Sequence, residues 1–268
     1  MKKIIVTLTL IALFVACGRN SVTNRRQLKL IPEAQLQAQA LTEYRSFLST
    51  AKVVSTSGSR DAEMVNRVGK RVAAAITQYY TAQNKASVLE GFEWEFNLVN
   101  DKQVNAWCMP GGKVVVYSGL LGVTQNEAAL AVVMGHEICH AVAHHGNERM
   151  SNGLLAQGVE VVGNIFTQNN EKVNSLFNQV FAPGVQVLGI LPNSRTQEYE
   201  ADKFGLIFSA LSGYNPQEAV PFWTRMASAG GGQKPPEFLS THPSDENRIA
   251  RLQSFMPEAL TYYKPIQK

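Results

Sequence analysis

The sequence predicts an α+β fold that is mostly helical, with a small three-stranded sheet beside one apolar helix. Apolar residues recur at helical spacing over residues 31–48 and 61–80, and the spacing changes to the alternation of a strand over residues 92–99. An apolar stretch that starts near residue 127 then carries two histidines in the spacing His-Glu-x-x-His. With 45% hydrophobic and 17% charged residues among 268, the composition favours one domain with a sizeable core.

Residues 1–17 are expected to be a lipoprotein signal peptide outside the fold. Two lysines precede an apolar run that is too short to span a bilayer comfortably. The run ends in a small residue followed by Cys17, as in the bacterial lipobox, although Phe14 stands where that pattern usually has leucine. An ordinary signal peptide is the alternative. Lipidation of Cys17 would anchor the protein to a membrane, expected to be the outer one, and place it in the periplasm. Residues 18–30 would then be a polar tether, and residues 31–268 a single domain.

The first elements of the domain are expected to be two helices followed by three strands. One helix begins at about Pro32, which suits a first helical turn, and a second covers residues 61–80. The strands are expected at residues 92–99, 104–109 and 113–118, with a Pro-Gly-Gly turn between the last two.

The helix that carries the histidine motif is expected to begin at Thr124, because Thr124-Gln-Asn-Glu127 fits a capping box. Residues 151–193 are apolar but broken by glycine and proline, which predicts helices interrupted by a loop. The remaining helices are expected at residues 196–211, 216–226 and 244–255, the last of them capped by Ser244.

The chemistry of the motif follows from its spacing. His136 and His140 stand on one helix face, roughly 6 Å apart along the axis, so one zinc ion could accept a nitrogen atom from both. Glu137 lies beside the pair, where its carboxylate could remove a proton from a water molecule. The pattern therefore predicts a water-activating peptidase with one Zn²⁺ per chain. The alternative is three structural polar residues, which would be costly to bury unpaired in so apolar a helix.

A catalytic zinc ion needs three protein ligands and one open position. His144 lies about 12 Å along the helix axis from His136, too far to share a metal ion with it. His144 and His145 are therefore expected beside the ligands or at the surface. Glu198 and Asp202 lie on one face of a later helix. Glu198 could be the third ligand, with Asp202 hydrogen-bonded to a zinc-binding histidine, but a solvated acidic face would give the same pattern.

Several segments together resemble a known family, and they extend over most of the chain after residue 17. They are Asn105-Ala-Trp-Cys-Met-Pro-Gly-Gly112, Tyr117-Ser-Gly-Leu-Leu121, His136-Glu137-x-x-His140, Arg195-x-x-Glu198-Tyr-Glu-Ala-Asp202, Gly213-Tyr-Asn-Pro216 and Thr241-His242-Pro243. The sequence resembles the gluzincin metallopeptidases, the family of the CaaX prenyl protease and HtpX, and within it the periplasmic lipoprotein proteases such as LoiP and BepA. This resemblance implies a zincin-type fold, a zinc cofactor and Glu198 as the third ligand.

The resemblance also implies roles for residues outside the motif helix. His242 would approach the zinc ion, where it would either stabilise the oxyanion or close the open position at rest. Arg248 would lie in the same neighbourhood, with a surface salt bridge as the equal alternative. Residues 104–109 would form an edge strand above the cleft, to which an extended substrate could add as a further strand. The strand residues expected to bind substrate are Asn105, Ala106, Trp107 and Cys108.

These features favour a zinc-dependent endopeptidase of the bacterial cell envelope, and the resemblance alone implies that its substrates are unfolded or misassembled envelope proteins. The alternative is a zinc-stabilised chaperone or assembly factor for outer-membrane proteins, with latent proteolysis. The sequence has no basic cluster interleaved with aromatic residues, so nucleic-acid binding is not expected. Cys108 and Cys139 could form a disulfide in an oxidising compartment, but two buried free thiols are the favoured interpretation.

Overall fold

The computed structural model describes residues 17–158, 165–167, 170–181, 194–229, 236–242 and 247–266. Its helices are α2 (Glu33–Thr50), α3 (Arg60–Ala82), η1 (Ala86–Leu89), α4 (Ser118–Thr124), α5 (Glu127–Val142), α6 (His145–Ala156), α7 (Glu171–Phe181), α8 (Arg195–Leu211), η2 (Pro216–Glu218), α9 (Ala219–Ser228), α10 (Glu237–Thr241) and α11 (Arg248–Thr261). Its strands are β1 (Cys17–Arg19), β2 (Arg26–Leu28), β3 (Val53–Val54), β4 (Glu95–Val99), β5 (Ala106–Met109) and β6 (Lys113–Tyr117). The predicted α+β class with mostly helical content is confirmed.

The central sheet has four strands in the order β3-β4-β6-β5. β4 and β6 run parallel, whereas the two outer pairs are antiparallel. The sequence predicts three of these four strands and misses β3, which consists only of Val53 and Val54 and is too short to show the alternation of a strand. Within the described residues β5 pairs only with β6, so it lies at an edge of the sheet.

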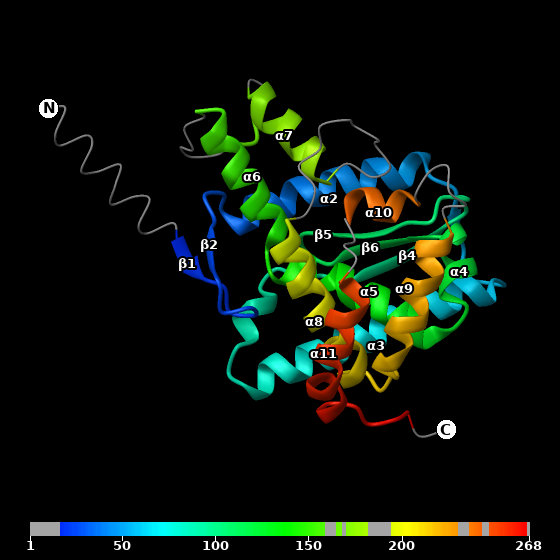
Figure 1. Ribbon diagram of the computed structural model, residues 1–268. Helices are drawn as coiled ribbons and strands as arrows, with labels where there is room; N and C mark the ends of the chain where they lie inside the picture. Colours follow the sequence, from blue (N-terminus) through cyan, green and yellow to red (C-terminus); the bar gives the residue numbers. More distant parts are fainter. Residues whose placement is uncertain are drawn as a thin grey trace, which may run out of the picture.

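β6 is buried along its whole length and separates two hydrophobic cores. Val114 and Val116 belong to the larger core, which contains the inner faces of α3 and α5. Val115 and Tyr117 belong to the smaller one, which contains the inner face of α2. Since successive side chains of a strand point to opposite faces, the sheet is a middle layer. Figure 1 shows α2 on one side of it and α3 and α5 on the other.

Two helix ends differ from those expected. α5 begins after Asn126, whose side chain accepts a hydrogen bond from the backbone N–H three residues later, at 2.8 Å. The capping box expected at Thr124 is wrong, because α4 ends there and Gln125 adopts a left-handed conformation with φ of 64°. α11 continues to Thr261, past the end expected near Phe255. Ser244, the residue expected to cap α11, lies outside the described residues. So does most of the part of residues 151–193 that is not in α6 or α7.

Residues 17–28 form a hairpin where the sequence predicts a tether. β1 pairs antiparallel with β2, and the side chains of Asn20 and Gln27 are buried. Both side-chain amides donate to the carbonyl oxygen of Ala143 at 2.9 Å, just beyond the end of α5. Backbone carbonyls at a helix end need such partners, so these bonds fix the hairpin to the domain. In Figure 1 the hairpin lies next to α6.

The predictions about the membrane are tested only in part. Residues 1–16 lie outside the described residues, so the signal peptide and the lipidation of Cys17 remain predictions. None of the helices in the described part of the chain combines the length and the apolar character needed to cross a bilayer.

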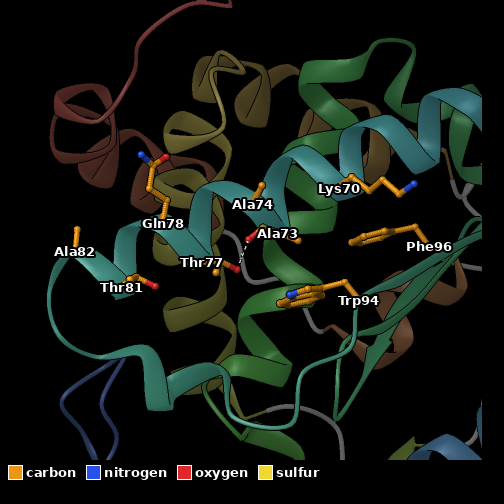
Figure 2. A pocket seen from close by; sticks show the side chains of 9 residues that line it. All are labelled: Lys70, Ala73, Ala74, Thr77, Gln78, Thr81, Ala82, Trp94 and Phe96. Carbon is orange, nitrogen blue, oxygen red and sulfur yellow. Dashed lines mark hydrogen bonds between the residues drawn. The ribbon is translucent and has the colours of Figure 1, made fainter.

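An apolar groove of about 660 Å³ lies between α3 and the aromatic side chains that lead into β4 (Figure 2). The rings of Trp94 and Phe96 are nearly parallel there, with their centres 6.2 Å apart. The groove is lined by Lys70, Ala73, Ala74, Thr77, Gln78, Thr81, Ala82, Trp94 and Phe96. It shares no residue with the histidine cluster described next, so the two are separate features.

Candidate metal centre

The two motif histidines lie on the side of α5 that packs against α8. Every residue of α5 from Ala129 to Val142 is buried, and His136 and His140 are only 2% and 8% exposed. Their Nε2 atoms are 3.1 Å apart. Glu198, near the start of α8, faces both: one carboxylate oxygen is 3.4 Å from Nε2 of His136, and the other is 3.4 Å from Nε2 of His140. The structure therefore brings the three predicted ligands together.

His242 completes a cluster of four side chains whose potential ligand atoms all lie within 4.8 Å of one another. Its Nδ1 is 3.2 Å from Nε2 of His136 and 3.1 Å from Oε1 of Glu198. A tetrahedral zinc ion with bonds of about 2.0–2.1 Å holds its ligand atoms about 3.3 Å apart. Five separations in the cluster, from 3.1 to 3.4 Å and involving both oxygens of Glu198, are close to this spacing. The cluster could therefore hold a zinc ion, with His242 at the fourth corner.

The charge of Glu198 suits a metal ligand. Within the described residues its Oε2 is buried without a hydrogen-bond partner. Burial disfavours the ionised form, but His242 and His136 outweigh it, and the pKa of Glu198 lies well below its ordinary value. A buried carboxylate needs a cation or several hydrogen bonds to offset its lost hydration. Nη2 of Arg248 lies 3.5 Å from Oε2 of Glu198, and a metal ion among these ligands would add a second cation.

Asp202 supports His136 from the side away from the cluster, and Arg248 contacts both Asp202 and Glu198, with its Nη2 3.5 Å from Oε2 of Glu198. Oδ1 of Asp202 is 3.1 Å from Nδ1 of His136 and accepts a hydrogen bond from Arg248 at 2.6 Å. The guanidinium group of Arg248 lies 3.3 Å from the ring centre of Trp223, a cation–π contact. Because Arg248 is 2% exposed, the alternative of a surface salt bridge is wrong. The bond at Nδ1 orients the imidazole and leaves Nε2 to face the cluster.

A second supporting group, behind His140, is only partly expected from the sequence. Nδ1 of His145 is 2.8 Å from Nδ1 of His140, and Nε2 of His145 is 2.9 Å from a carboxylate oxygen of Glu200. On an unbroken helix, the residue five positions after His140 would point to another side. Here α5 ends at Val142, and His144 adopts a left-handed conformation with φ of 53° before α6 begins. No proline marks this break, so the sequence does not predict the turn that brings His145 to His140.

Glu137 lies on the neighbouring side of α5, beside the fourth corner of the cluster. Its side chain is buried, and its Oε1 is 3.4 Å from Nε2 of His242. Burial raises the pKa of Glu137 to about 7. A carboxyl group with such a pKa can both accept and return a proton near neutral pH, which is the property expected of a general base.

The segment that carries His242 is joined to the strand expected to bind substrate. The backbone N–H of Phe238, in α10, donates to the carbonyl oxygen of Val104 at 3.2 Å. The ring of Phe238 stacks on that of His242, with centres 4.5 Å apart. Of the strand residues expected to bind substrate, Asn105 and Ala106 are buried, whereas Trp107 and Cys108 are half-buried. The edge strand and the fourth corner of the cluster are thus held together.

The two cysteines near the centre are free thiols, so the disulfide alternative for Cys108 and Cys139 is wrong. Burial raises the pKa of both thiols well above the ordinary value. Because the thiolate is the form that attacks carbonyls and binds metals, neither cysteine is a candidate nucleophile or ligand.

The distance between the ligand-bearing helices is set by two glycines. A Cβ atom on Gly205 of α8 would lie 2.9 Å from the backbone nitrogen of His136, and one on Gly135 of α5 would lie 2.8 Å from the carbonyl oxygen of Gly205. We expect Gly205→Ala to push α8 away from α5, which would lower the free energy of unfolding by about 2 kcal/mol. Zinc affinity should fall as well, because Glu198 moves with α8.

Thermal unfolding and zinc competition with a chelator would measure both effects of Gly205→Ala. The matched control is Gly122→Ala in α4, where an added Cβ meets no atom within 4 Å. The control should keep the parental stability and zinc affinity. Parental values for Gly205→Ala would show that the close helix contact does not set the ligand geometry.

Comparison with known proteins agrees with this geometry. Residues 59–256 match peptidase family M48. The chain is 37% identical over 188 residues to the mitochondrial metalloendopeptidase OMA1 of Arabidopsis thaliana, a match that covers 69% of this chain and 37% of that protein. It is 33% identical over 186 residues to OMA1 of Saccharomyces cerevisiae, covering 66% of this chain and 51% of that protein. It is 32% identical over 193 residues to the beta-barrel assembly-enhancing protease of Yersinia pestis, covering 70% and 37%.

The matched part of the chain spans about half of these relatives or less. The family match nevertheless contains most of the chain, including the motif helix, the Glu198 helix and His242. The chain therefore belongs to peptidase family M48, a family of zinc-dependent metallopeptidases.

Proposed function

We propose that this protein is a zinc-dependent endopeptidase that hydrolyses internal peptide bonds of protein substrates. The observation that carries the proposal is the position of Glu137 beside a ligand set with tetrahedral spacing, formed by His136, His140 and Glu198. A zinc ion bound there would supply a Lewis acid for water activation and carbonyl polarisation. A site that served only to stabilise the fold would have no use for a buried carboxylate next to its ligands.

The side chains of the chain itself would carry the proton transfers. Glu137 would accept the proton of the attacking water and return it to the amine that leaves, as its pKa of about 7 allows. Asp202 and His145 would hold the two ligand imidazoles in one orientation through their Nδ1 atoms.

We infer that His242 closes the site at rest. Its Nδ1 occupies the fourth corner of the cluster, and its Nε2 lies 3.4 Å from Glu137. Because a catalytic zinc site needs one open position, His242 would have to move before water and substrate can enter. Of the two roles that the sequence leaves open for His242, this geometry favours closure over stabilisation of the oxyanion.

The variant His242→Ala is therefore expected to cleave casein faster than the parent while it still binds one zinc ion per chain. The expected gain is roughly tenfold, the effect of removing a closed state favoured by about 1.4 kcal/mol. Initial cleavage rates and zinc content would be measured together. His144→Asn is the control, since asparagine tolerates the left-handed conformation and His144 lies outside the cluster. Loss of cleavage with zinc retained would instead assign His242 to the oxyanion.

We further propose that the protein works in the bacterial cell envelope, where a lipid on Cys17 holds it at the periplasmic side of the outer membrane. Its substrates would be unfolded or misassembled envelope proteins, bound as an added strand along the edge of β5. Such binding uses main-chain hydrogen bonds and so needs little sequence preference. The similarity to the beta-barrel assembly-enhancing protease of Yersinia pestis supports this proposal. A relationship to HtpX, LoiP and the CaaX prenyl protease rests on the sequence motifs alone and is likewise part of the proposal.

A second function, assembly of outer-membrane proteins with proteolysis held latent, is supported by the position of His242 at the fourth corner. The test is casein cleavage by the purified, zinc-loaded protein, with and without 1,10-phenanthroline. Cleavage that the chelator stops and added zinc restores would support the endopeptidase. Bound zinc without cleavage, in both the parent and His242→Ala, would contradict it and favour the assembly factor.

A further inference from the structure

Among the described residues of the N-terminal hairpin, Arg25 is the one that binds Glu200, a carboxylate beside the metal centre. Arg25 lies between β1 and β2, and its guanidinium group binds two carboxylates. It donates to the two oxygens of Glu148 at 2.5 and 2.7 Å, and to the two oxygens of Glu200 at 2.7 and 3.1 Å. Four charge-assisted hydrogen bonds to a planar guanidinium group hold both carboxylates in a single geometry.

Glu200 continues this set of contacts to a metal ligand. It accepts a hydrogen bond from Nε2 of His145 at 2.9 Å, and Nδ1 of His145 is 2.8 Å from Nδ1 of His140. With a metal ion on Nε2 of His140, the proton of that ring would sit on Nδ1 and be donated to Nδ1 of His145. His145 then donates its own proton from Nε2 to Glu200, so each bond has one donor and one acceptor. The contacts thus fix both the ring orientation and the tautomer of His140.

We propose that Arg25 is a positioning residue for the metal site: by holding Glu200 in place, it fixes His145 and, through it, the ring of His140. The inference rests on the proposed zinc site and deepens it, since it makes the hairpin of residues 17–28 part of that site. Arg25 touches no ligand itself.

The other ligand histidine is supported in a parallel way. His136 is bonded at Nδ1 by Asp202, and Asp202 is held by Arg248 at 2.6 Å. Each ligand histidine is therefore oriented by a carboxylate that an arginine holds, directly for His136 and through His145 for His140. Arg248 comes from the C-terminal part of the chain, whereas Arg25 comes from the hairpin at the opposite end.

A purely structural role for Arg25 makes a different prediction. Arg25 also binds Glu148 in α6, so it could serve only to fasten the hairpin. Asn20 fastens the same hairpin to Ala143 without contacting Glu200. Loss of either residue should loosen the hairpin, but only loss of Arg25 should change how tightly zinc is bound.

The test measures the zinc dissociation constant of the full chain by competition with a chromophoric chelator. Arg25→Met is expected to weaken zinc binding by about 10- to 100-fold, the effect of losing an outer hydrogen-bond partner of a metal ligand. Arg25→Lys should bind zinc more tightly than Arg25→Met but less tightly than the parent, because an ammonium group keeps the positive charge but cannot donate to both carboxylates in the planar geometry of a guanidinium group. Asn20→Ala should lower the unfolding temperature and leave the zinc dissociation constant unchanged. The visible spectrum of the Co²⁺-loaded protein should shift in Arg25→Met and stay unchanged in Asn20→Ala.

Parental zinc affinity in Arg25→Met, with only a lower unfolding temperature, would overturn the proposal and leave Arg25 a structural residue. Should Arg25→Met fail to fold, Arg25→Lys and Asn20→Ala decide instead, and equal zinc affinities in those two variants would overturn it. A parent chain that binds no zinc would refute the metal site itself, which is a separate and recognisable result.

Discussion

Substitution of Glu137 by glutamine is expected to reduce casein cleavage by about 10³-fold while zinc stays bound at one ion per chain. Glutamine has the size and shape of glutamate but cannot accept a proton from water. Glu137 contributes no atom to the ligand cluster, so its loss leaves the four candidate ligands in place. Cleavage rate, zinc content and unfolding temperature would be measured on the same preparations, and only the rate should change.

The control for this variant is Glu127→Gln, on the same helix. Glu127 lies at the start of α5 and pairs with Arg67 at the surface, away from the cluster. It should cleave at the parental rate. Parental cleavage by Glu137→Gln would mean that another group takes the proton, and loss of its zinc would mean that Glu137 is needed for metal binding rather than for proton transfer.

Removal of Glu198 has the largest effect expected on the metal itself. Glu198→Ala deletes the anionic ligand and leaves only imidazoles in the cluster. Zinc affinity should fall by more than about 100-fold, beyond what loss of an outer partner alone produces. Cleavage should disappear with the metal, and zinc should no longer raise the unfolding temperature of the protein. Chelator competition and thermal unfolding with and without zinc would measure these effects.

A suitable control is Glu258→Ala in α11, which removes an exposed carboxylate that pairs with Lys203 of α8. It perturbs the same helix pair without touching the cluster. The informative contrary result would be parental zinc affinity in Glu198→Ala. His136, His140 and His242 would then form a site of three histidines, and His242 would be a permanent ligand in place of a residue that closes the site at rest.

Local patterns account for the parts of the structure that the sequence predicts well. Two residues four apart on a helix are neighbours in any protein, so the pairing of His136 with His140 can be read from the sequence. The same holds for Glu198 and Asp202, which the structure places on one face of α8. The alternating strands and the long amphipathic α3 are likewise found close to their expected ranges. The meeting of the two helices, the approach of His242 and Arg248 to them, and the role of the edge strand needed the resemblance to a family.

The parts that the sequence does not predict depend on contacts between distant segments. Asn20 and Gln27 look like residues of a solvated tether, and they are buried only because Ala143 offers a carbonyl oxygen to both. His145 reaches His140 only because α5 breaks at His144. Polar residues carry no periodic signal, and their partners lie more than a hundred positions away in the first case. Contacts between distant segments, and not local propensity, determine whether such polar side chains are buried.

The position of Arg25 has a consequence for where the catalytic unit begins. The family match starts at residue 59, well after Arg25 and after the whole of α2. A fragment trimmed to residues 59–256 would keep every candidate ligand and Glu137, yet it would lose the hairpin that supports His140. Natural variation at Arg25 would look like drift in a leader sequence. Because Arg25 binds Glu200, we expect instead that the residues at positions 25 and 200 vary together, and that both are retained where the zinc ligands are retained.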